Sequence, residues 1–252
     1  MNCQCKLSQT RRPEGLPDGL RPRIFAGLTD HELAAILAQA RHQRFAGPSV
    51  VVHEADPADQ IYLLTSGQGA HFVVTGEGRK ILVYWLTAGQ IFGGVALLAS
   101  PGLYLASTEM HTPGCALVWS RRVIREIVAR HPIILDNALS IATTEHFAWQ
   151  LSARISLGTD EASVRVARLL VSLACGIGRS LPGGVEILVA NEDLAGASGV
   201  TPYTVSRLIA EWQRAGILSK GRGRITLRRP ELLAARAQTA EKSPLQSGRS
   251  VA

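Results

Sequence analysis

The hydrophobic and polar positions divide the chain into three segments with different periodicities. Between about Ala46 and Trp119, short hydrophobic runs recur at roughly ten-residue spacing and are separated by glycines, which is typical of an antiparallel β barrel or roll. The seven expected strands are residues 49–54, 61–67, 70–78, 79–89, 91–98, 103–110 and 114–120, with corners at Gly67, Gly76, Gly78 and Gly89.

Helical patterns lie on both sides of this strand-rich segment. Thr29 and Glu32 have the spacing of a capping box, which predicts a short helix after Thr29. From Arg121 to about Ser156 the spacing predicts a long helical tract whose apolar surface is wider than a single roll needs. We expect this tract to pair with its own copy across a two-fold axis and to end at a hinge near residues 157–160. Its apolar positions are Ile133, Ile134, Leu135, Ala138, Ile141, Ala142, Trp149 and Leu151.

The third segment, Asn191 to Leu208, predicts two short helices joined by a tight turn. Gly199 lies at the turn, where a residue without Cβ adopts positive φ at little cost. Thr201 then suits an N-cap, and Pro202 suits the first helical position. The core-facing positions of the second helix are Val205, Leu208, Ile209 and Trp212, which leaves Tyr203, Thr204, Ser206 and Arg207 facing solvent.

A short hairpin is expected directly after the second helix, over residues 219–227, with a Gly/Arg tip. The segment from Thr201 to Pro230 carries seven basic residues and one acidic residue, Glu211. Such a cluster favours binding of a polyanion, and the whole segment is interpreted as a winged helix-turn-helix. The basic residues are Arg207, Arg214, Lys220, Arg222, Arg224, Arg228 and Arg229.

The bulk composition agrees with an anionic partner. The net charge is +7 and the isoelectric point is near 9.7. No apolar run approaches the roughly 18 to 20 residues that a membrane-spanning helix needs, and the first 15 residues lack the hydrophobic region of a signal peptide. Four cysteines do not form the disulfide framework of a secreted protein of this size. We therefore expect a cytoplasmic protein without membrane partners.

These patterns predict an α+β fold, made of an N-terminal antiparallel, jelly-roll-like β-roll, a long dimerisation helix and a C-terminal winged helix-turn-helix. No phosphate-binding glycine loop, zinc-ligand spacing or nucleophile elbow is found, so neither a catalytic residue nor a metal site is expected, and the chain is not expected to be an enzyme. The expected divisions are a disordered segment (1–22), a roll sensor domain (23–120), the dimerisation helix and hinge (121–158), the DNA-binding domain (159–232) and a largely disordered tail (233–252).

The order of roll, long helix, hinge and winged helix resembles the CRP/FNR family of bacterial transcription regulators over about residues 24–230. The most specific match is the segment LAGASGVTPYTVSRLIAEWQRAGILSKGRGRITL, and the family's roll signature corresponds to Gly89–Gly94, GQIFGG. The resemblance implies a homodimer that places two recognition helices in successive major grooves of double-stranded DNA. It also implies RNA polymerase as a partner.

The resemblance assigns roles to several residues of the expected recognition helix. Arg207 matches the family arginine that contacts a guanine, and Ser206 matches a serine that contacts a thymine in the oxygen-sensing branch. Tyr203 replaces the usual glutamate, and Pro202 replaces an arginine of some members, so a different DNA site is expected at those bases. Candidate phosphate contacts are Thr201, Thr204, Lys220, Arg222 and Arg224.

Departures from the family pattern concern the effector. Cyclic-AMP-binding members hold the ribose with a glutamate and the phosphate with an Arg-Ser pair, positions that fall at Gly94, Tyr104 and Leu105. The adenine-contacting pair falls at about Trp149 and Gln150. A buried phosphate without its cation loses several kcal/mol, so cyclic AMP is not expected to be the ligand. The candidate effector pocket comprises Gly93, Gly94, Tyr104, Leu105 and Trp149.

The signal that the roll senses stays open. An iron–sulfur cluster needs four ligands, whereas Cys3, Cys5 and Cys115 make three, and Cys175 falls in the DNA-binding domain. A redox-sensitive pair of Cys3 and Cys5 is a further alternative. Haem is another, with His71 and His111 in the strand-rich region but no attachment motif, so ligand spacing supports neither cofactor. A function of another class, a roll-domain regulatory subunit acting through protein contacts, also stays open.

Overall fold

The computed structural model describes residues 16–17, 19–78 and 80–238, without the side chains of Glu145, Ala148, Trp149, Ser152, Ala153, Thr159 and Gln238. The chain divides into two compact units, Met1–Trp149 and Gln150–Ala252. The expectations for residues 1–15 and 239–252, including Cys3, Cys5 and the terminal disorder, lie outside the described residues.

The first unit begins with a short 3-10 turn, Arg23–Phe25, and helix α1, Asp30–Leu37. The predicted capping box is confirmed. The Thr29 side chain accepts a hydrogen bond from the Glu32 backbone N–H (3.3 Å), and the Glu32 carboxylate accepts one from the Thr29 N–H (2.8 Å). Phe25 packs edge-on against Trp119, with ring centroids 5.8 Å apart, which anchors the start of the described chain to the roll.

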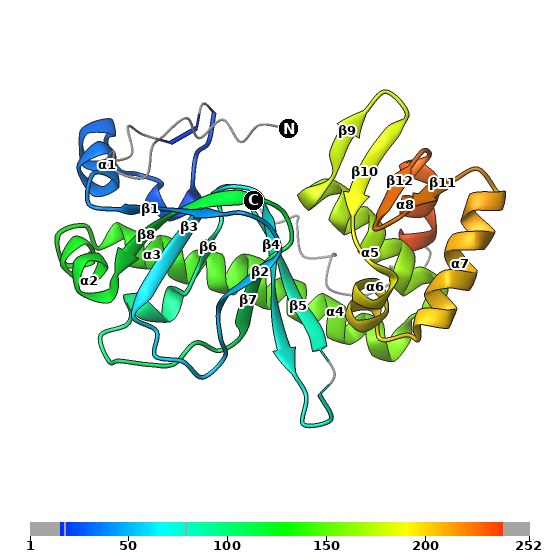
Figure 1. The fold of residues 1–252 in the computed structure, drawn as a ribbon, viewed down its shortest axis with the longest axis horizontal. Helices are drawn as coiled ribbons and strands as arrows, with labels where there is room; N and C mark the ends of the chain where they lie inside the picture. Colours follow the sequence, from blue (N-terminus) through cyan, green and yellow to red (C-terminus); the bar gives the residue numbers. More distant parts are fainter. Residues whose placement is uncertain (1–15, 18, 79, 239–252) are drawn as a thin grey trace, which may run out of the picture. The chain divides into compact units, whose positions relative to one another are not determined.

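Two four-stranded antiparallel sheets form the roll (Figure 1), which confirms the predicted fold class. The first sheet has the order β1-β8-β3-β6 and the second the order β2-β7-β4-β5. The first sheet contains Arg41–Phe45 (β1), Gly114–Ser120 (β8), Gln60–Ser66 (β3) and Ile91–Phe92 (β6). The second contains Ser49–Val52 (β2), Ser107–Met110 (β7), Gln68–Val74 (β4) and Lys80–Thr87 (β5).

Strand β3 is buried on both faces, which explains its continuous hydrophobic run. Tyr62 and Leu64 belong to the core between the two sheets, and Ile61 and Leu63 belong to a second core against the helices. Successive residues of a strand point to opposite faces, so this one strand contributes to both cores. Trp119 on β8 joins the second core, and its indole N–H donates to the carbonyl of Ile36 (3.0 Å).

One strand was missed, and two predicted strands needed correction. Strand β1 was not predicted, because only Phe45 of its five residues is buried and the backbone pairing with β8 leaves no hydrophobic pattern. The strand expected over 91–98 is wrong beyond Phe92, because Gly93 has φ of 76° and a 3-10 turn, Gly94–Leu97, follows. The strand expected from residue 103 begins at Ser107.

The helical tract expected as one piece from Arg121 is interrupted at Pro132. Helix α2 spans Arg121–Arg130, α3 spans Ile133–Ser140, a π-helix spans Ile141–Phe147 and α4 spans Ala148–Thr159. A residue before proline is pushed out of the helical region, and His131 has φ of −130° and ψ of 75°. None of the described helices combines the length and apolar character needed to cross a membrane.

The second unit packs helices against a sheet of order β11-β12-β10-β9. Its elements are α5 (Ala162–Ile177), β9 (Arg179–Leu181), β10 (Gly184–Leu188), α6 (Asn191–Ser198), α7 (Pro202–Arg214), β11 (Leu218–Gly221), β12 (Arg224–Leu227) and α8 (Pro230–Gln238). The β9–β10 hairpin was not predicted. The chain after residue 232 was expected to be tail, yet it continues α8 to Gln238, with Leu233 buried.

Candidate nucleic-acid interface

The two predicted helices of the helix-turn-helix are confirmed as α6 and α7. Gly199 at the turn has φ of 62°, as expected for a position that favours glycine. Thr201 caps α7, because its hydroxyl accepts a hydrogen bond from the Thr204 N–H (3.1 Å). Pro202 occupies the first turn, where its missing N–H leaves no bond unmade.

Helix α7 has one buried face and one exposed face. Val205, Leu208, Ile209 and Trp212 are each at most 3% exposed, as the spacing predicted. On the other face Tyr203 is 78% exposed, and Ser206 and Arg207 are exposed beside it. The aromatic ring, the hydroxyl and the guanidinium are therefore all presented to solvent by one rigid helix.

Two hydroxyls of the predicted DNA-contacting set are already engaged at the helix start. Thr201 Oγ1 lies 2.9 Å from Thr204 Oγ1, and Thr204 is half-buried. The Ser206 hydroxyl accepts a hydrogen bond from the side-chain amide of Asn191, the first residue of α6 (2.8 Å). The spacing that predicted the outward face of α7 gave no sign of Asn191, whose contact depends on how the two helices pack.

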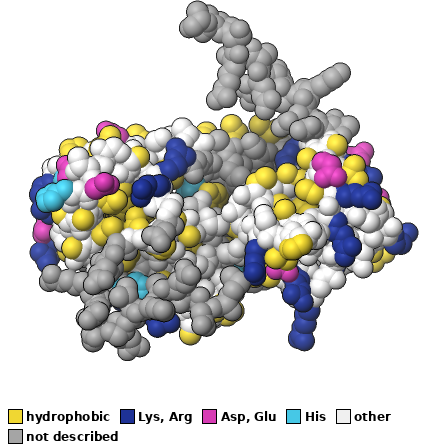
Figure 2. Space-filling model, turned by 90° about the horizontal axis from the view of Figure 1, so that it is seen from above, with side chains coloured by type: hydrophobic (Ala, Val, Ile, Leu, Met, Phe, Trp, Pro, Cys, Tyr) yellow, Lys and Arg dark blue, Asp and Glu magenta, His cyan; other side chains and the backbone are white. Residues whose placement is uncertain are grey.

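The hairpin of β11 and β12, here called the wing, carries the remaining predicted basic residues. Lys220, Arg222 and Arg224 are exposed, and Gly223 at the tip has φ of 67°. Several Lys and Arg side chains stand out on the surface of the second unit in Figure 2. Arg224 Nη1 lies 3.7 Å from the carboxylate of Glu186 on β10, so part of its charge is offset. Lys220 and Arg222 are exposed cations of the wing for which the described residues show no ion pair.

Arg165 on α5 holds the turn between α6 and α7. Its Nε donates to the carbonyl of Ser198 (2.8 Å), and its Nη2 donates to the carbonyl of Gly199 (3.3 Å). Its Nη1 donates to the carbonyl of Asp160, the residue directly after α4 (2.7 Å). The guanidinium of Arg165 thus satisfies carbonyls from two separate segments, a role that no sequence spacing indicated.

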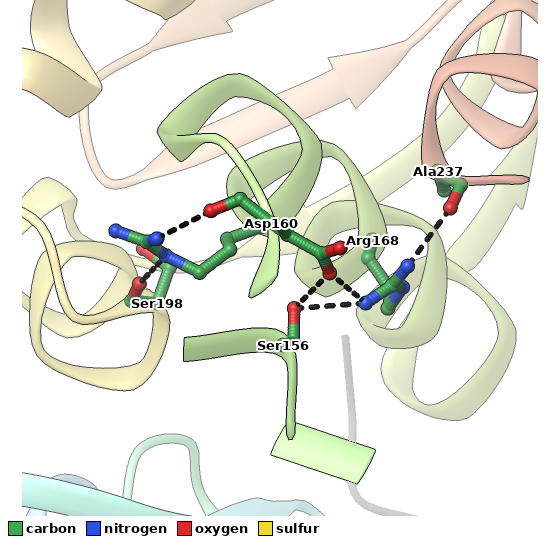
Figure 3. Close-up of polar contacts among 6 residues, drawn as sticks. Ser156, Asp160, Arg168, Ser198 and Ala237 are labelled. Atoms are coloured by element: carbon green, nitrogen blue, oxygen red, sulfur yellow. Dashed lines mark hydrogen bonds and ion pairs between the residues drawn. The ribbon is translucent and has the colours of Figure 1, made fainter. Parts of the chain in front are cut away.

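A second arginine of α5 fixes the end of α4. Arg168 Nη1 forms an ion pair with the carboxylate of Asp160, whose side chain is 4% exposed, and also donates to the Ser156 hydroxyl (2.8 Å). Its Nη2 donates to the carbonyl of Ala237 on α8 (3.0 Å). Figure 3 shows these contacts converging on the arginine. The end of α4 is therefore bonded to α5 and belongs to the same compact unit as the helix-turn-helix.

The roll residues predicted to line an effector pocket have different environments. Gly93 lies against Tyr104, because a Cβ at Gly93 would come within 3.1 Å of the tyrosine ring. The Tyr104 hydroxyl donates to the carbonyl of Gln60 (2.9 Å) and accepts from its N–H (3.2 Å). Burial raises the pKa of Tyr104 to about 12, so it stays neutral. Gly94 begins the 3-10 turn, Leu105 is 80% exposed, and the Trp149 side chain lies outside the described part.

A polar and aromatic group lies inside the roll. His71 Nδ1 is 2.8 Å from the Thr108 hydroxyl. The Tyr84 ring lies 4.3 Å from the His146 ring of the π-helix, and its hydroxyl accepts from the Gln90 side chain (2.9 Å). Burial, and then the charge of His146, lower the pKa of His71 to about 4. His71 is therefore neutral near pH 7.

The described side chains that were considered as haem or cluster ligands lie on different parts of the fold. His111 Nε2 is 2.8 Å from the Glu109 carboxylate, Cys115 is fully buried on β8, and Cys175 is exposed on α5. Within the described ranges, no group of three or more His, Cys, Asp or Glu residues is arranged to hold a metal ion.

Two family models match the chain, one for each unit. The cyclic nucleotide-binding domain matches residues 42–131, and the Crp-like helix-turn-helix domain matches residues 164–236. The chain is 24% identical over 220 residues to a CRP-like cAMP-activated global transcriptional regulator of Mycobacterium tuberculosis, covering 86% of this chain and 97% of that protein. It is 23% identical to the cyclic AMP receptor protein of Thermus thermophilus, covering 83% and 94%.

Solved structures have the same fold. FixK2 from Bradyrhizobium japonicum matches with a TM-score of 0.67 at 20% identity, covering 78% of this chain and 96% of that one. A variant of CooA from Carboxydothermus hydrogenoformans matches with a TM-score of 0.65 at 21% identity, covering 91% and 99%. With a nucleotide-binding-type roll, a Crp-like helix-turn-helix and relatives matched over most of their length, the chain belongs to the CRP/FNR family of DNA-binding transcription regulators.

Proposed function

We propose that the chain is a homodimeric, sequence-specific regulator that binds a two-fold symmetric DNA site through α7 and does not respond to cyclic AMP. The observation that carries the proposal is the outward face of α7, where Tyr203, Ser206 and Arg207 are all exposed above a fully buried opposite face. Arginine binds guanine through two hydrogen bonds in the major groove, and the exposed wing cations suit the phosphates. RNA polymerase is the second partner, and the cytoplasm, which holds the bacterial chromosome, is the compartment.

The helical tract supports the homodimer. Large apolar side chains are exposed along its part in the first unit, and Leu135 and Leu139 are four residues apart on α3, the spacing that places side chains on one face of a helix. These side chains are exposed by 39% to 65%, and a group of exposed apolar side chains marks an interaction surface. A second copy related by a two-fold axis presents the same row and covers it. The row comprises Leu135, Leu139 and Phe147.

Independence of cyclic AMP is supported by Tyr104 and Leu105. One relative is named as a cAMP-activated regulator and another as a cyclic AMP receptor protein. In this chain, however, the phosphate-binding pair of cyclic-AMP-binding members is replaced by a tyrosine and a leucine. The Tyr104 hydroxyl is bonded to both backbone groups of Gln60, and its raised pKa keeps it neutral. Leu105 is turned to solvent. Neither residue can compensate the charge of a buried phosphate.

The test is a selection of binding sites from random duplex DNA, with the purified full chain and with or without cyclic AMP. The proposal expects a two-fold symmetric consensus, a protein of twice the chain mass bound per site, and the same affinity with and without the nucleotide. A protein that stays monomeric and selects no consensus contradicts the proposal. A large gain of affinity with cyclic AMP contradicts its effector part alone.

A further inference from the structure

We infer that Asn191 is a specificity-determining positioning residue, which fixes the Ser206 hydroxyl as a hydrogen-bond donor toward a base. The inference rests on the proposed DNA binding of α7 and deepens it. Asn191 lies on α6 and Ser206 on α7, so the contact joins the two helices of the motif on its DNA-facing side. The role concerns which base is preferred at one position, and not how tightly DNA is held overall.

The polarity of the hydrogen bond follows from the atoms involved. Asn191 Nδ2 lies 2.8 Å from Ser206 Oγ, and an amide nitrogen has hydrogens to donate but no lone pair to accept with. The serine oxygen must therefore be the acceptor. One of its two lone pairs is used, and its own hydrogen is directed away from the amide. Among the described residues, Asn191 is the one side-chain partner of the Ser206 hydroxyl.

The place of Asn191 in its own helix leaves its amide available for this task. The N-cap of α6 is Ala190, which makes no side-chain cap, and Asn191 is the first residue inside the helix. Asparagine is common at caps because its side chain bonds backbone N–H groups, but here the side chain crosses to α7 instead. Asn191 is half-buried, which restricts its motion, whereas Ser206 is exposed and open to a ligand.

The outward hydrogen selects among base edges. In the major groove guanine presents two acceptors, adenine N7 and thymine O4 are also acceptors, and adenine N6 and cytosine N4 are donors. A hydroxyl whose oxygen already accepts a bond is a stronger donor, because hydrogen bonds in a chain polarise one another. Ser206 should therefore favour a base pair that presents an acceptor at its position and disfavour one that presents an amino group there. The guanidinium of Arg207, the next residue, can only donate hydrogen bonds, so it needs no second residue to fix its direction.

The experiment compares base preferences for the wild type, Ser206→Ala, Asn191→Ala and Asn191→Asp. The Ser206→Ala profile identifies the base pair that faces Ser206, as the position whose preference disappears. At that position alone, Asn191→Ala should reduce the ratio of best to worst base by about three- to tenfold, the size of one lost hydrogen bond. Asn191→Asp should go further and shift the preference toward an amino-bearing edge. A carboxylate of the same shape can only accept, so it takes the serine hydrogen and leaves the lone pairs outward.

A general loss of DNA affinity is distinguished from a change in base preference by measuring the ratio of affinities for different duplexes. Asn191→Asp adds a negative charge near phosphates and should weaken binding to every duplex alike, so the measured quantity is the ratio between duplexes at one salt concentration. Glu192→Gln, at the exposed neighbouring residue, is the control that changes charge without changing any ratio. Melting temperatures of the free variants show whether α6 is intact.

Two outcomes overturn the inference. If Asn191→Ala and Asn191→Asp weaken all duplexes equally and leave the preference at the Ser206 position intact, Asn191 is a phosphate contact or a purely structural residue. If the preference at that position changes identically in both variants, the direction of the hydrogen bond is irrelevant. Failure of the proposed function gives a different result, because the wild type itself would then select no sequence.

Discussion

The guanidinium of Arg165 is hydrogen-bonded to the backbone carbonyl of Ser198, the last residue of α6 (2.8 Å). It also bonds the carbonyl of Asp160, so the start of the turn before α7 and the end of α4 share one donor group. Carbonyls at helix ends lack partners within the helix, and a guanidinium supplies several donors in a fixed plane. The orientation of α7 therefore depends on a residue of α5 that lies outside the exposed face of α7.

Substitution of Arg165 by alanine should lower both stability and DNA affinity. The loss of hydrogen bonds from a charged group to partly buried carbonyls should reduce the free energy of unfolding by on the order of 2–3 kcal/mol. Arg165→Lys keeps the charge but not the planar set of donors. Its stability and DNA affinity should lie between those of the wild type and of Arg165→Ala. Urea denaturation and DNA titration measure these effects. Arg236→Ala removes an exposed arginine of α8 and should change little; equal losses in both variants would point to charge alone.

Arg207 and Arg222 should affect DNA binding in different ways. Arg207→Ala should weaken binding to the selected site by about 1–3 kcal/mol and relax the preference at one base pair, because a guanine contact is lost. Arg222→Ala, at the wing tip, should weaken binding to all sequences and reduce the salt dependence by about one charge. Titrations of cognate and random duplexes at several salt concentrations separate the two. An equal loss on both duplexes for Arg207→Ala contradicts its base-contacting role.

The exposed row of the helical tract gives a test of the homodimer. Leu139 and Phe147 are 64% and 65% exposed, so Leu139→Glu and Phe147→Glu should leave the fold of the single chain intact. In a dimer, either substitution would bury a glutamate carboxylate from both copies at the interface, so the dimer should dissociate into monomers. Leu105→Glu, at a residue 80% exposed on the roll, is the matched control. Sedimentation should show monomers for the first two variants and dimers for the control, and unchanged dimers throughout would contradict this interface.

Local physical chemistry was enough to predict the helix-turn-helix. Gly199, Thr201 and Pro202 act through their own backbone conformations and hydrogen bonds, so their roles follow from neighbours in the sequence. Strand β1 illustrates the opposite case. Four of its five side chains are exposed or half-buried, and it is a strand because its backbone pairs with β8, about seventy residues later in the chain. Pairing of this kind leaves no period in the sequence.

The same contrast holds at the candidate site. The outward face of α7 follows from the helical spacing of Val205 and Leu208 on its buried side. The contacts of Arg165 and Asn191 join residues that are 33 and 15 positions apart, and they exist only because the helices of the second unit pack as they do. Spacing identified the residues on the exposed face of α7, and tertiary packing was needed to identify the residues that hold this helix in place.

His71 should make the roll sensitive to acid. Its pKa is about 4 in the folded protein, against an ordinary value of 6.5 that applies in the unfolded chain. Between these values the unfolded chain binds a proton that the folded protein excludes, so the free energy of unfolding should fall as the pH drops from about 6.5 toward 4, by about 1–3 kcal/mol. His71→Gln cannot titrate and should remove that part of the pH dependence. Urea denaturation of both proteins near pH 7 and pH 5 measures the difference, with the exposed His53→Gln as control. Parallel loss of stability in wild type and His71→Gln would show that other groups cause the acid sensitivity.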